Sequence, residues 1–264
     1  MYRFYSMNEK TAYLTGYNWF SNITVKNGWN RIAYLSSINL PLSVALADYT
    51  DFGSDGDIIK SQDEFAVLNV IGENKVWKGT LKYLSTGSGY MLKRNAKDER
   101  EFYYPYYGSS SRYTGNMTTT RAAAAPLFVN NTAGNMNVIA VTEGVDLQEG
   151  DRLVAYHGAD VCGIAEADED GLFFLTVAEP LNSAATDVQF TIERDGETVA
   201  LTSQSMKYVS DAVSGTINEP TVIRFIEAGR YADGEWYSIQ GIRLPARPTE
   251  KGVYIFNGHK VLVK

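Results

Sequence analysis

Short runs of alternating apolar and polar residues follow one another along much of the chain. Clear examples are NVIAVT (137–142), RLVAYH (152–157), LFFLTV (172–177) and VQFTIE (188–193). A period of two is typical of half-buried β-strands, and turn residues such as Asp195-Gly196 separate the runs, as antiparallel hairpins require. The pattern predicts an all-β protein in which residues 121–228 form an immunoglobulin-like antiparallel β-sandwich.

The sequence pattern before the sandwich predicts a β-rich module with one short helix. Helical spacing is found only in LPLSVALADY (40–49), where Leu42, Leu46 and Tyr49 share a face and Ser43 is available as an N-cap. The segment YYGSSSRYTGNMTTTRAAAAP (106–126) then interrupts the alternation with Ser, Thr, Gly and a short Ala run. We therefore place a domain boundary near residue 120, with the module at 1–120.

Four large apolar side chains are expected in the cores of these two regions. They lie in strand-like runs of alternating or continuous apolar character: Trp29, Trp77, Val154 and Phe174.

The sequence of residues 229–264 predicts a C-terminal hairpin tail that packs on the fold. Asn257-Gly258 lies between VYIF and HKVLV. Asn-Gly between apolar runs is the strongest short-range hairpin signal, because both turn residues need positive φ. An earlier hairpin is expected about Gln240-Gly241, with Trp236 anchoring the tail. We expect residues 252–263 to belong to the fold and to stabilise it.

Composition and charge exclude several classes of protein. The chain has 264 residues, 44% of them hydrophobic, which suffices for one large or two medium domains with their own cores. Its formal net charge of -7 argues against general affinity for nucleic-acid backbones or anionic lipid. Cys162 is the single cysteine, and only His157 and His259 offer imidazole ligands. Internal disulfides are thus excluded, and neither a zinc enzyme nor any cofactor is expected.

The N-terminal sequence bears on the origin of the chain. It lacks the basic start and the apolar stretch of a signal peptide, and no run reaches the roughly eighteen apolar residues of a membrane span. Since the chain opens directly in Tyr-rich, strand-like sequence, we expect a mature region or a piece of a longer protein. The alternative is a cytosolic protein that begins at Met1.

A series of short motifs occupies residues 28–94. In chain order, with a short Leu-rich helix between the first and the second, they are Gly28-Trp29-Asn30, Gly56-Asp57-Ile58-Ile59-Lys60-Ser61-Gln62, Trp77-Lys78-Gly79-Thr80-Leu81 and Gly87-Ser88-Gly89-Tyr90-Met91. This order resembles a β-rich module that recurs in large secreted or cell-surface proteins of Bacteroidetes. Residues 134–165 resemble the β-sandwich that often follows such modules.

The ending of the chain extends the resemblance. Lys251-Gly252-Val253-Tyr254-Ile255 and Asn257-Gly258-His259-Lys260-Val261 are similar to the terminal sequences of many such Bacteroidetes proteins. The resemblance implies export, with the protein secreted or displayed at the cell surface. The tail then serves either as a sorting signal or simply as the last hairpin of the fold.

Two groups of residues are candidates for catalytic machinery. The acids of EADED (166–170) precede a glycine and are typical of a solvated hairpin tip rather than of the facing carboxylate pair of a glycosidase. A cysteine nucleophile requires a base that lowers its pKa, and His157 can meet Cys162 across the turn between them. The alternating run around Cys162 is more typical of a small buried residue. We assign no catalytic residue.

The acid-rich loop DYTDFGSDGD (48–57) offers a weak metal site. Clustered carboxylates suit hard cations such as calcium, and Asp51, Asp55 and Asp57 are the candidates. Their spacing differs from that of the twelve-residue calcium loop, so we expect no metal.

Tyrosines supply the candidate binding residues. The chain has 18 Tyr and 4 Trp. Aromatic rings with a polar edge suit stacking on sugars and protein interfaces. Within EFYYPYYGSSSRY (101–113), Pro105 disfavours a central strand and the Gly-Ser run favours exposure. The candidates are Tyr103, Tyr104, Tyr106, Tyr107 and Tyr113. Alternatively, these rings pack into a core or a domain junction.

The sequence leaves two main classes of function. The first is a non-catalytic secreted or cell-surface module for adhesion, binding a glycan or a host or cell-surface protein, in a gut-type Bacteroidetes bacterium. The alternative is an accessory or scaffold C-terminal region of a larger secreted hydrolase. A third class, an enzyme in its own right, has no catalytic signature to support it. We expect no nucleic-acid partner and no membrane span.

Overall fold

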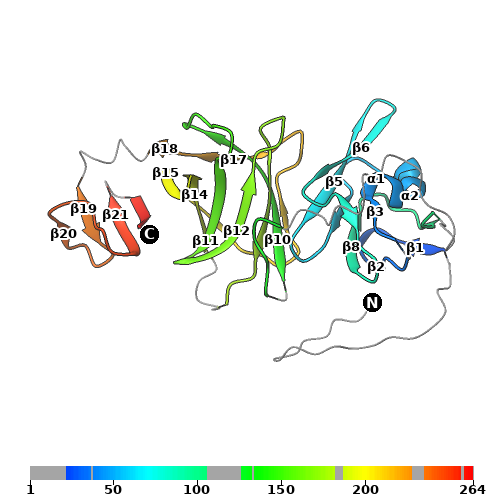
Figure 1. Ribbon diagram of the computed structural model, residues 1–264, viewed down its shortest axis with the longest axis horizontal. Helices are drawn as coiled ribbons and strands as arrows, with labels where there is room; N and C mark the ends of the chain where they lie inside the picture. The colour runs from blue at the N-terminus through cyan, green and yellow to red at the C-terminus, as the bar shows by residue number, and fades with distance from the viewer. Residues whose placement is uncertain are drawn as a thin grey trace. The chain divides into compact units, whose positions relative to one another are not determined.

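The computed structural model describes residues 22–36, 38–105, 126–132, 134–181, 187–227, 235–256 and 259–263. Within them the chain is mostly β-strand with two short helices, which confirms the all-β class (Figure 1). The contacts divide the chain into two compact units, unit 1 (Met1–Ala125) and unit 2 (Pro126–Lys264). The boundary expected near residue 120 lies outside the described residues. The tail belongs to the same unit as the sandwich.

Unit 1 is built on a five-stranded antiparallel sheet in the order β2-β8-β4-β5-β6. Two strand pairs, β1–β9 and β3–β7, and two helices accompany this sheet (Figure 1, blue to cyan). The elements are β1 (Ile23–Val25), β2 (Gly28–Ala33), β3 (Leu40–Pro41), α1 (Leu42–Ala45), α2 (Ala47–Phe52), β4 (Ile58–Lys60), β5 (Phe65–Ile71), β6 (Asn74–Gly79), β7 (Tyr83–Leu84), β8 (Gly89–Arg94) and β9 (Arg100–Phe102).

The single helix expected over 40–49 is two helices that meet at Leu46. Ser43 does not cap α1, because the helix already begins at Leu42 and no side chain bonds its N-terminus. The N–H of Leu42 instead donates to the carbonyl of Lys82, 2.8 Å away. The start of α1 is therefore fixed by the segment before β7, a tertiary contact that local sequence does not reveal.

The two tryptophans expected in the core of unit 1 are only half-buried, so that prediction was wrong. Trp29 lies on β2 and Trp77 on β6, the two edge strands of the five-stranded sheet. An edge strand has a neighbour on one side only, which leaves part of a large ring accessible. The Lys60 ammonium lies 4.8 Å from the ring centroid of Trp29, a cation–π arrangement.

Motif residues of unit 1 determine local backbone structure. The Asn30 amide donates to the carbonyl of Lys26 (2.7 Å) and accepts the Lys26 N–H (2.9 Å), which closes the turn between β1 and β2. Gly79 has a φ of 144°, and a Cβ there would lie 2.3 Å from the carbonyl oxygen of Phe65. Only glycine permits this approach at the end of β6.

Unit 2 contains a sandwich of two sheets. One sheet has the order β13-β10-β16 with β17 also paired to β10, and the other has the order β12-β11-β14-β15-β18. The strands are β10 (Asn135–Glu143), β11 (Arg152–His157), β12 (Asp160–Glu166), β13 (Phe173–Ala178), β14 (Asp187–Arg194), β15 (Glu197–Lys207), β16 (Val213–Ser214), β17 (Thr221–Arg224) and β18 (Ile226–Glu227).

The first strand of the sandwich departs from the purely antiparallel arrangement that was expected. β10 pairs antiparallel with β13 but parallel with both β16 and β17. In the parallel ladder Ala140 lies opposite Thr221 and Glu143 opposite Arg224. The alternation of a strand encodes which residues face the core but not which neighbour the strand takes, so the sequence pattern could not predict this pairing.

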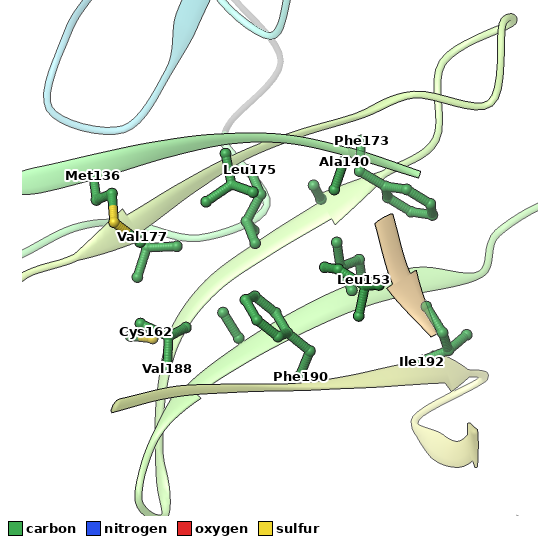
Figure 2. Packing of buried hydrophobic residues seen from close by; sticks show 14 of the residues in the cluster. Met136, Ala140, Leu153, Cys162, Phe173, Leu175, Val177, Val188, Phe190 and Ile192 are labelled. Carbon is green, nitrogen blue, oxygen red and sulfur yellow. The ribbon is translucent and has the colours of Figure 1, made fainter. Parts of the chain in front are cut away.

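The sandwich core lies between the two sheets (Figure 2). Val154 and Phe174 are buried, as the sequence predicted, at 1% and 4% exposure. The core itself is formed by alternate residues of facing strands, which is the arrangement that a period of two produces. They include Met136, Ala140, Leu153, Cys162, Phe173, Leu175, Val177, Val188, Phe190 and Ile192.

The two sheets approach each other closely along one side of the sandwich. There β12 of one sheet contacts β13 of the other. A Cβ at Gly163 of β12 would lie 2.5 Å from the carbonyl oxygen of Thr176 on β13, so a larger residue would separate the strands. Glycine at this position therefore permits the close approach.

The tail forms its own four-stranded sheet in the order β20-β19-β21-β22. Phe256 pairs with His259, as expected of a hairpin about residues 257–258, and the ring of Trp236 packs 4.7 Å from that of Phe256. Leu201 of β15 joins their cluster together with Val261 and Val263. The strands are β19 (Trp236–Ser238), β20 (Arg243–Leu244), β21 (Gly252–Phe256) and β22 (His259–Val263).

The tail also covers part of the outer face of β11. Val154 and Tyr156, which point away from the sandwich core, are buried in a cluster that includes Val253 of the tail. Both faces of β11 are thus covered, which explains why its apolar run is nearly continuous.

A buried ion pair fixes the turn that precedes β11. The Asp151 carboxylate, with 1% of its side chain exposed, accepts from the Arg194 guanidinium at 2.7 Å and from the N–H of Gln148 at 2.9 Å. The hydrogen bond from Arg194 holds the pKa of Asp151 below its ordinary value. This pair joins the 148–151 turn to β14.

We predict that Val261→Ala lowers the free energy of unfolding by about 1.5 kcal/mol, because two buried carbons at about 0.8 kcal/mol each are lost. The exposed Lys260 provides a control, since Lys260→Ala should leave stability unchanged. Urea unfolding of the intact chain measures both. Equal stability of the two variants would show that the tail unfolds separately from the sandwich.

We also predict that Asp151→Asn lowers the free energy of unfolding by about 2–3 kcal/mol at pH 7. This loss is smaller than that for a fully buried ion pair because the Arg194 side chain is 30% exposed. The depressed pKa of Asp151 means that its contribution is present above the unfolded pKa and is lost as the pH falls. The difference between wild type and variant should therefore shrink towards pH 3. Glu149→Gln, a matched loss of charge on the same turn, should be neutral at both pH values.

Candidate functional site

A groove of about 490 Å³ runs along α1, α2 and the edge strand β6 in unit 1. Its volume falls within the range of about 300–1,000 Å³ that is usual for small-ligand sites. Its lining combines an indole ring with hydroxyl groups and charges, which are Ser43, Thr50, Asp51, Lys75, Trp77 and Lys82. We refer to it as the Trp77 groove.

The indole of Trp77 is held in place by α2. Its Nε1 donates to the Thr50 hydroxyl at 2.9 Å, and that hydroxyl donates to the carbonyl of Leu46 at 2.7 Å. The ring also packs against the core, with its centroid 6.1 Å from that of Tyr49. One part of Trp77 is therefore fixed against the core while another part lines the groove.

A second contact ties β6 to the same helix. The Lys75 ammonium donates to the carbonyl oxygens of Asp51 (2.8 Å) and Gly53 (2.9 Å) at the C-terminal end of α2. A cation at this end also favours the helix dipole. Lys75 and Trp77 therefore both link β6 to α2 beside the groove.

The helix is in turn held by a buried carboxylate. Asp57, which is fully buried, accepts from the Tyr49 hydroxyl of α2 at 2.7 Å and from the N–H groups of Ser54 and Asn95, both at 2.8 Å. Burial, and then the hydrogen bond to Asp57, raise the pKa of Tyr49. Tyr49 therefore stays a hydrogen-bond donor at all ordinary pH values.

The charges of the groove remain accessible. Asp51 and Lys82 are exposed, as is the hydroxyl-bearing Ser43. Lys82 interacts electrostatically with the half-buried Glu64, whose pKa is raised to about 7 by burial and by the neighbouring Asp63. The groove thus presents an aromatic surface beside both donors and acceptors, which suits a neutral ligand rich in hydroxyl groups.

The structure describes only Tyr103 and Tyr104 of the predicted tyrosine site. Tyr103 is 58% exposed, and its N–H donates to the Asp48 carboxylate at 3.0 Å, so it lies beside the helix whose residues line the Trp77 groove. Tyr104 is half-buried and packs edge-on against Tyr34 and Phe102, as the core-packing alternative predicts. Burial raises the pKa of Tyr104. Tyr106, Tyr107 and Tyr113 lie outside the described residues.

The three metal candidates have separate roles. Asp57 carries the hydrogen bonds described above, the Asp55 carboxylate accepts the N–H of Val70 at 2.8 Å, and Asp51 is exposed at the groove. In the described ranges, no three His, Cys, Asp or Glu side chains come together as a metal site would require.

The two groups of candidate catalytic residues lie in environments that serve the fold. His157 and Cys162 line one pocket of unit 2, but burial, and then the nearby Asp160, raise the pKa of the Cys162 thiol, whereas a nucleophile needs a lowered one. At the 166–170 hairpin, Glu166 pairs with Arg152 at 3.1 Å. The Asp168 carboxylate there accepts two backbone N–H groups of its own turn.

Sequence reasoning misses Trp77 as a groove residue because the apolar strand around it predicts a buried side chain. A signal was present in NKVWKG, since Lys75 and Lys78 flank Trp77 and lysine is typical of edge strands. The contribution of Thr50 and Lys75 depends on how α2 meets β6, which local sequence does not encode.

Comparisons with family models, curated proteins and solved structures returned no match. Among the helices that the structure describes, none is long and apolar enough to cross a membrane.

We predict that Glu64→Gln stabilises the protein by about 1 kcal/mol at pH 8 and has no effect near pH 4, a figure reduced for the partial solvation of Glu64. The raised pKa means that folding favours protonated Glu64, so this contribution is present below the unfolded pKa and is lost as the pH rises through about 7. Thermal or urea unfolding at both pH values tests this. An equal effect at pH 4 and pH 8 would contradict it, and the exposed Glu73→Gln serves as control.

Proposed function

We propose that this chain is a non-catalytic binding module of a secreted or cell-surface protein, and that the Trp77 groove binds a glycan. The observation that carries the proposal is the half-buried indole of Trp77, fixed by Thr50 and lining a groove with accessible polar groups. Protein cores do not require such an arrangement, whereas sugar recognition uses a flat apolar surface surrounded by hydrogen-bonding groups.

Recognition would combine stacking with hydrogen bonds. The apolar face of a sugar ring would lie on the exposed part of Trp77, while its hydroxyl groups would donate to the Asp51 carboxylate and accept from the Lys82 ammonium. The groove is preformed, because the contacts of Thr50 and Lys75 hold its walls without a ligand. A preformed site reduces the entropy lost on binding.

The location of the protein is proposed on sequence grounds. The motif order of residues 28–94 and the ending of the chain resemble secreted and surface proteins of Bacteroidetes, and a surface module that binds glycans would serve adhesion. A catalytic domain encoded upstream in the same reading frame would instead favour an accessory region of a secreted hydrolase.

We predict micromolar to millimolar dissociation constants for the glycan, corresponding to about 4–8 kcal/mol, because one stacked ring and no metal contribute. A glycan array identifies the ligand and titration calorimetry measures its affinity. Trp77→Ala should weaken binding at least about tenfold, since stacking on a ring is worth about 1.4 kcal/mol or more. Trp29→Ala changes the other half-buried indole of unit 1 and should leave the affinity unchanged.

Two outcomes would contradict the proposed site. If Trp77→Ala binds as tightly as the wild type while Tyr103→Ala does not bind, the site lies at the tyrosine segment. If the array shows no binding by a protein whose melting temperature is normal, the ligand is not a glycan.

A further inference from the structure

A second pocket, of about 210 Å³, lies in unit 2 at one end of the sandwich. It is formed where the end of β11, the start of β12 and the end of β13 meet the segment that precedes β10. At about 30 Å³ per water molecule in the liquid, it has room for roughly seven waters or one small organic molecule. It belongs to unit 2 whereas the Trp77 groove belongs to unit 1, and it is independent of the proposed function.

The pocket contains a buried histidine with a defined tautomer. His157 is 5% exposed, and its Nε2 lies 2.9 Å from the carbonyl oxygen of Ala178. A carbonyl only accepts, so Nε2 carries a proton, and in the Nε2–H tautomer Nδ1 is an acceptor. Among the described residues, Nδ1 has no hydrogen-bond partner. A buried acceptor of this kind favours a ligand that brings a donor.

The part of the pocket wall that precedes β10 is held by local hydrogen bonds. The Asn130 side chain donates to the carbonyl of Gly134 at 3.0 Å and accepts the N–H of Thr132 at 2.8 Å. The Thr132 hydroxyl accepts the N–H of Glu179 at 3.0 Å. These contacts hold Glu179 at the pocket before any ligand binds.

The charge of the lining points to a cation. Asp160 and Glu179 line the pocket, and none of the described residues that line it is a lysine or an arginine. Most of the remaining lining is apolar and includes Phe128, Val161 and Leu181. A ligand that satisfies all of these groups has N–H donors for His157, a positive charge for the two carboxylates and an apolar body.

We propose that this pocket binds a small primary amine with an apolar substituent. The ammonium group donates to Nδ1 of His157 and faces the carboxylate of Glu179, while the substituent contacts the apolar lining. Cys162 also lines the pocket and serves only as part of its apolar wall.

Nuclear magnetic resonance with three probes of one shape tests the proposal. Benzylamine, benzyl alcohol and benzoate are titrated into the full chain labelled with ¹³C at methyl groups and with ¹⁵N. Benzylamine should shift the methyl signals of Val161 and Ala178 and the Nδ1 signal of His157. Benzyl alcohol should bind about tenfold more weakly, because its donor is uncharged, and benzoate should not bind. Failure of benzylamine to shift these signals, or equal binding of benzoate, overturns the proposal.

Two variants of matched charge separate a specific site from general attraction to an acidic protein. Glu179→Gln should weaken benzylamine about tenfold and leave benzyl alcohol unchanged. Glu169→Gln removes the same charge at an exposed turn outside the pocket and should change neither. Equal weakening by both variants overturns the proposal. His157→Phe should abolish the binding of benzylamine, and if that variant does not fold, the comparison of Glu179 with Glu169 still decides.

Discussion

The buried carboxylate of Asp57 is the interaction on which unit 1 depends. A charge removed from water is tolerated only when donors surround it, and Asp57 receives them from α2, from the turn before β4 and from the residue after β8. Because α2 also carries Thr50, the position of the Trp77 indole follows from this carboxylate two contacts away. Asp57, α2 and the Trp77 groove are thus linked by a continuous series of contacts.

Sequence patterns predicted the features that are local in the chain. Asp195-Gly196 has φ values of 52° and 84°, the positive φ that a tight hairpin between β14 and β15 requires. Val154 and Phe174 are buried as predicted, although both lie outside the sandwich core and Val154 is covered by the tail. The same reasoning located the tail hairpin, whose strands pair with Gly252 opposite Val263.

Features that depend on neighbours distant in sequence could not be predicted in this way. Trp77 lies at the edge of its sheet, a consequence of strand order rather than of its own run of residues. Tyr104 packs on Tyr34, seventy residues earlier, although its own segment is typical of an exposed loop. In unit 2, the close approach of β12 and β13 depends on Gly163, because a Cβ there would lie 2.5 Å from the carbonyl oxygen of Thr176.

The parallel pairing of β10 with β17 also determines how the sandwich carries tension. β10 is the first strand of the sandwich, and β17 is one of its last. When the chain is pulled from the beginning of β10 and the end of β17, two parallel neighbours are drawn in opposite directions along their length. Their evenly spaced hydrogen bonds are then loaded together in shear, instead of opening one at a time like a zipper. This geometry resists stretching more strongly than an antiparallel hairpin that is pulled from its open end.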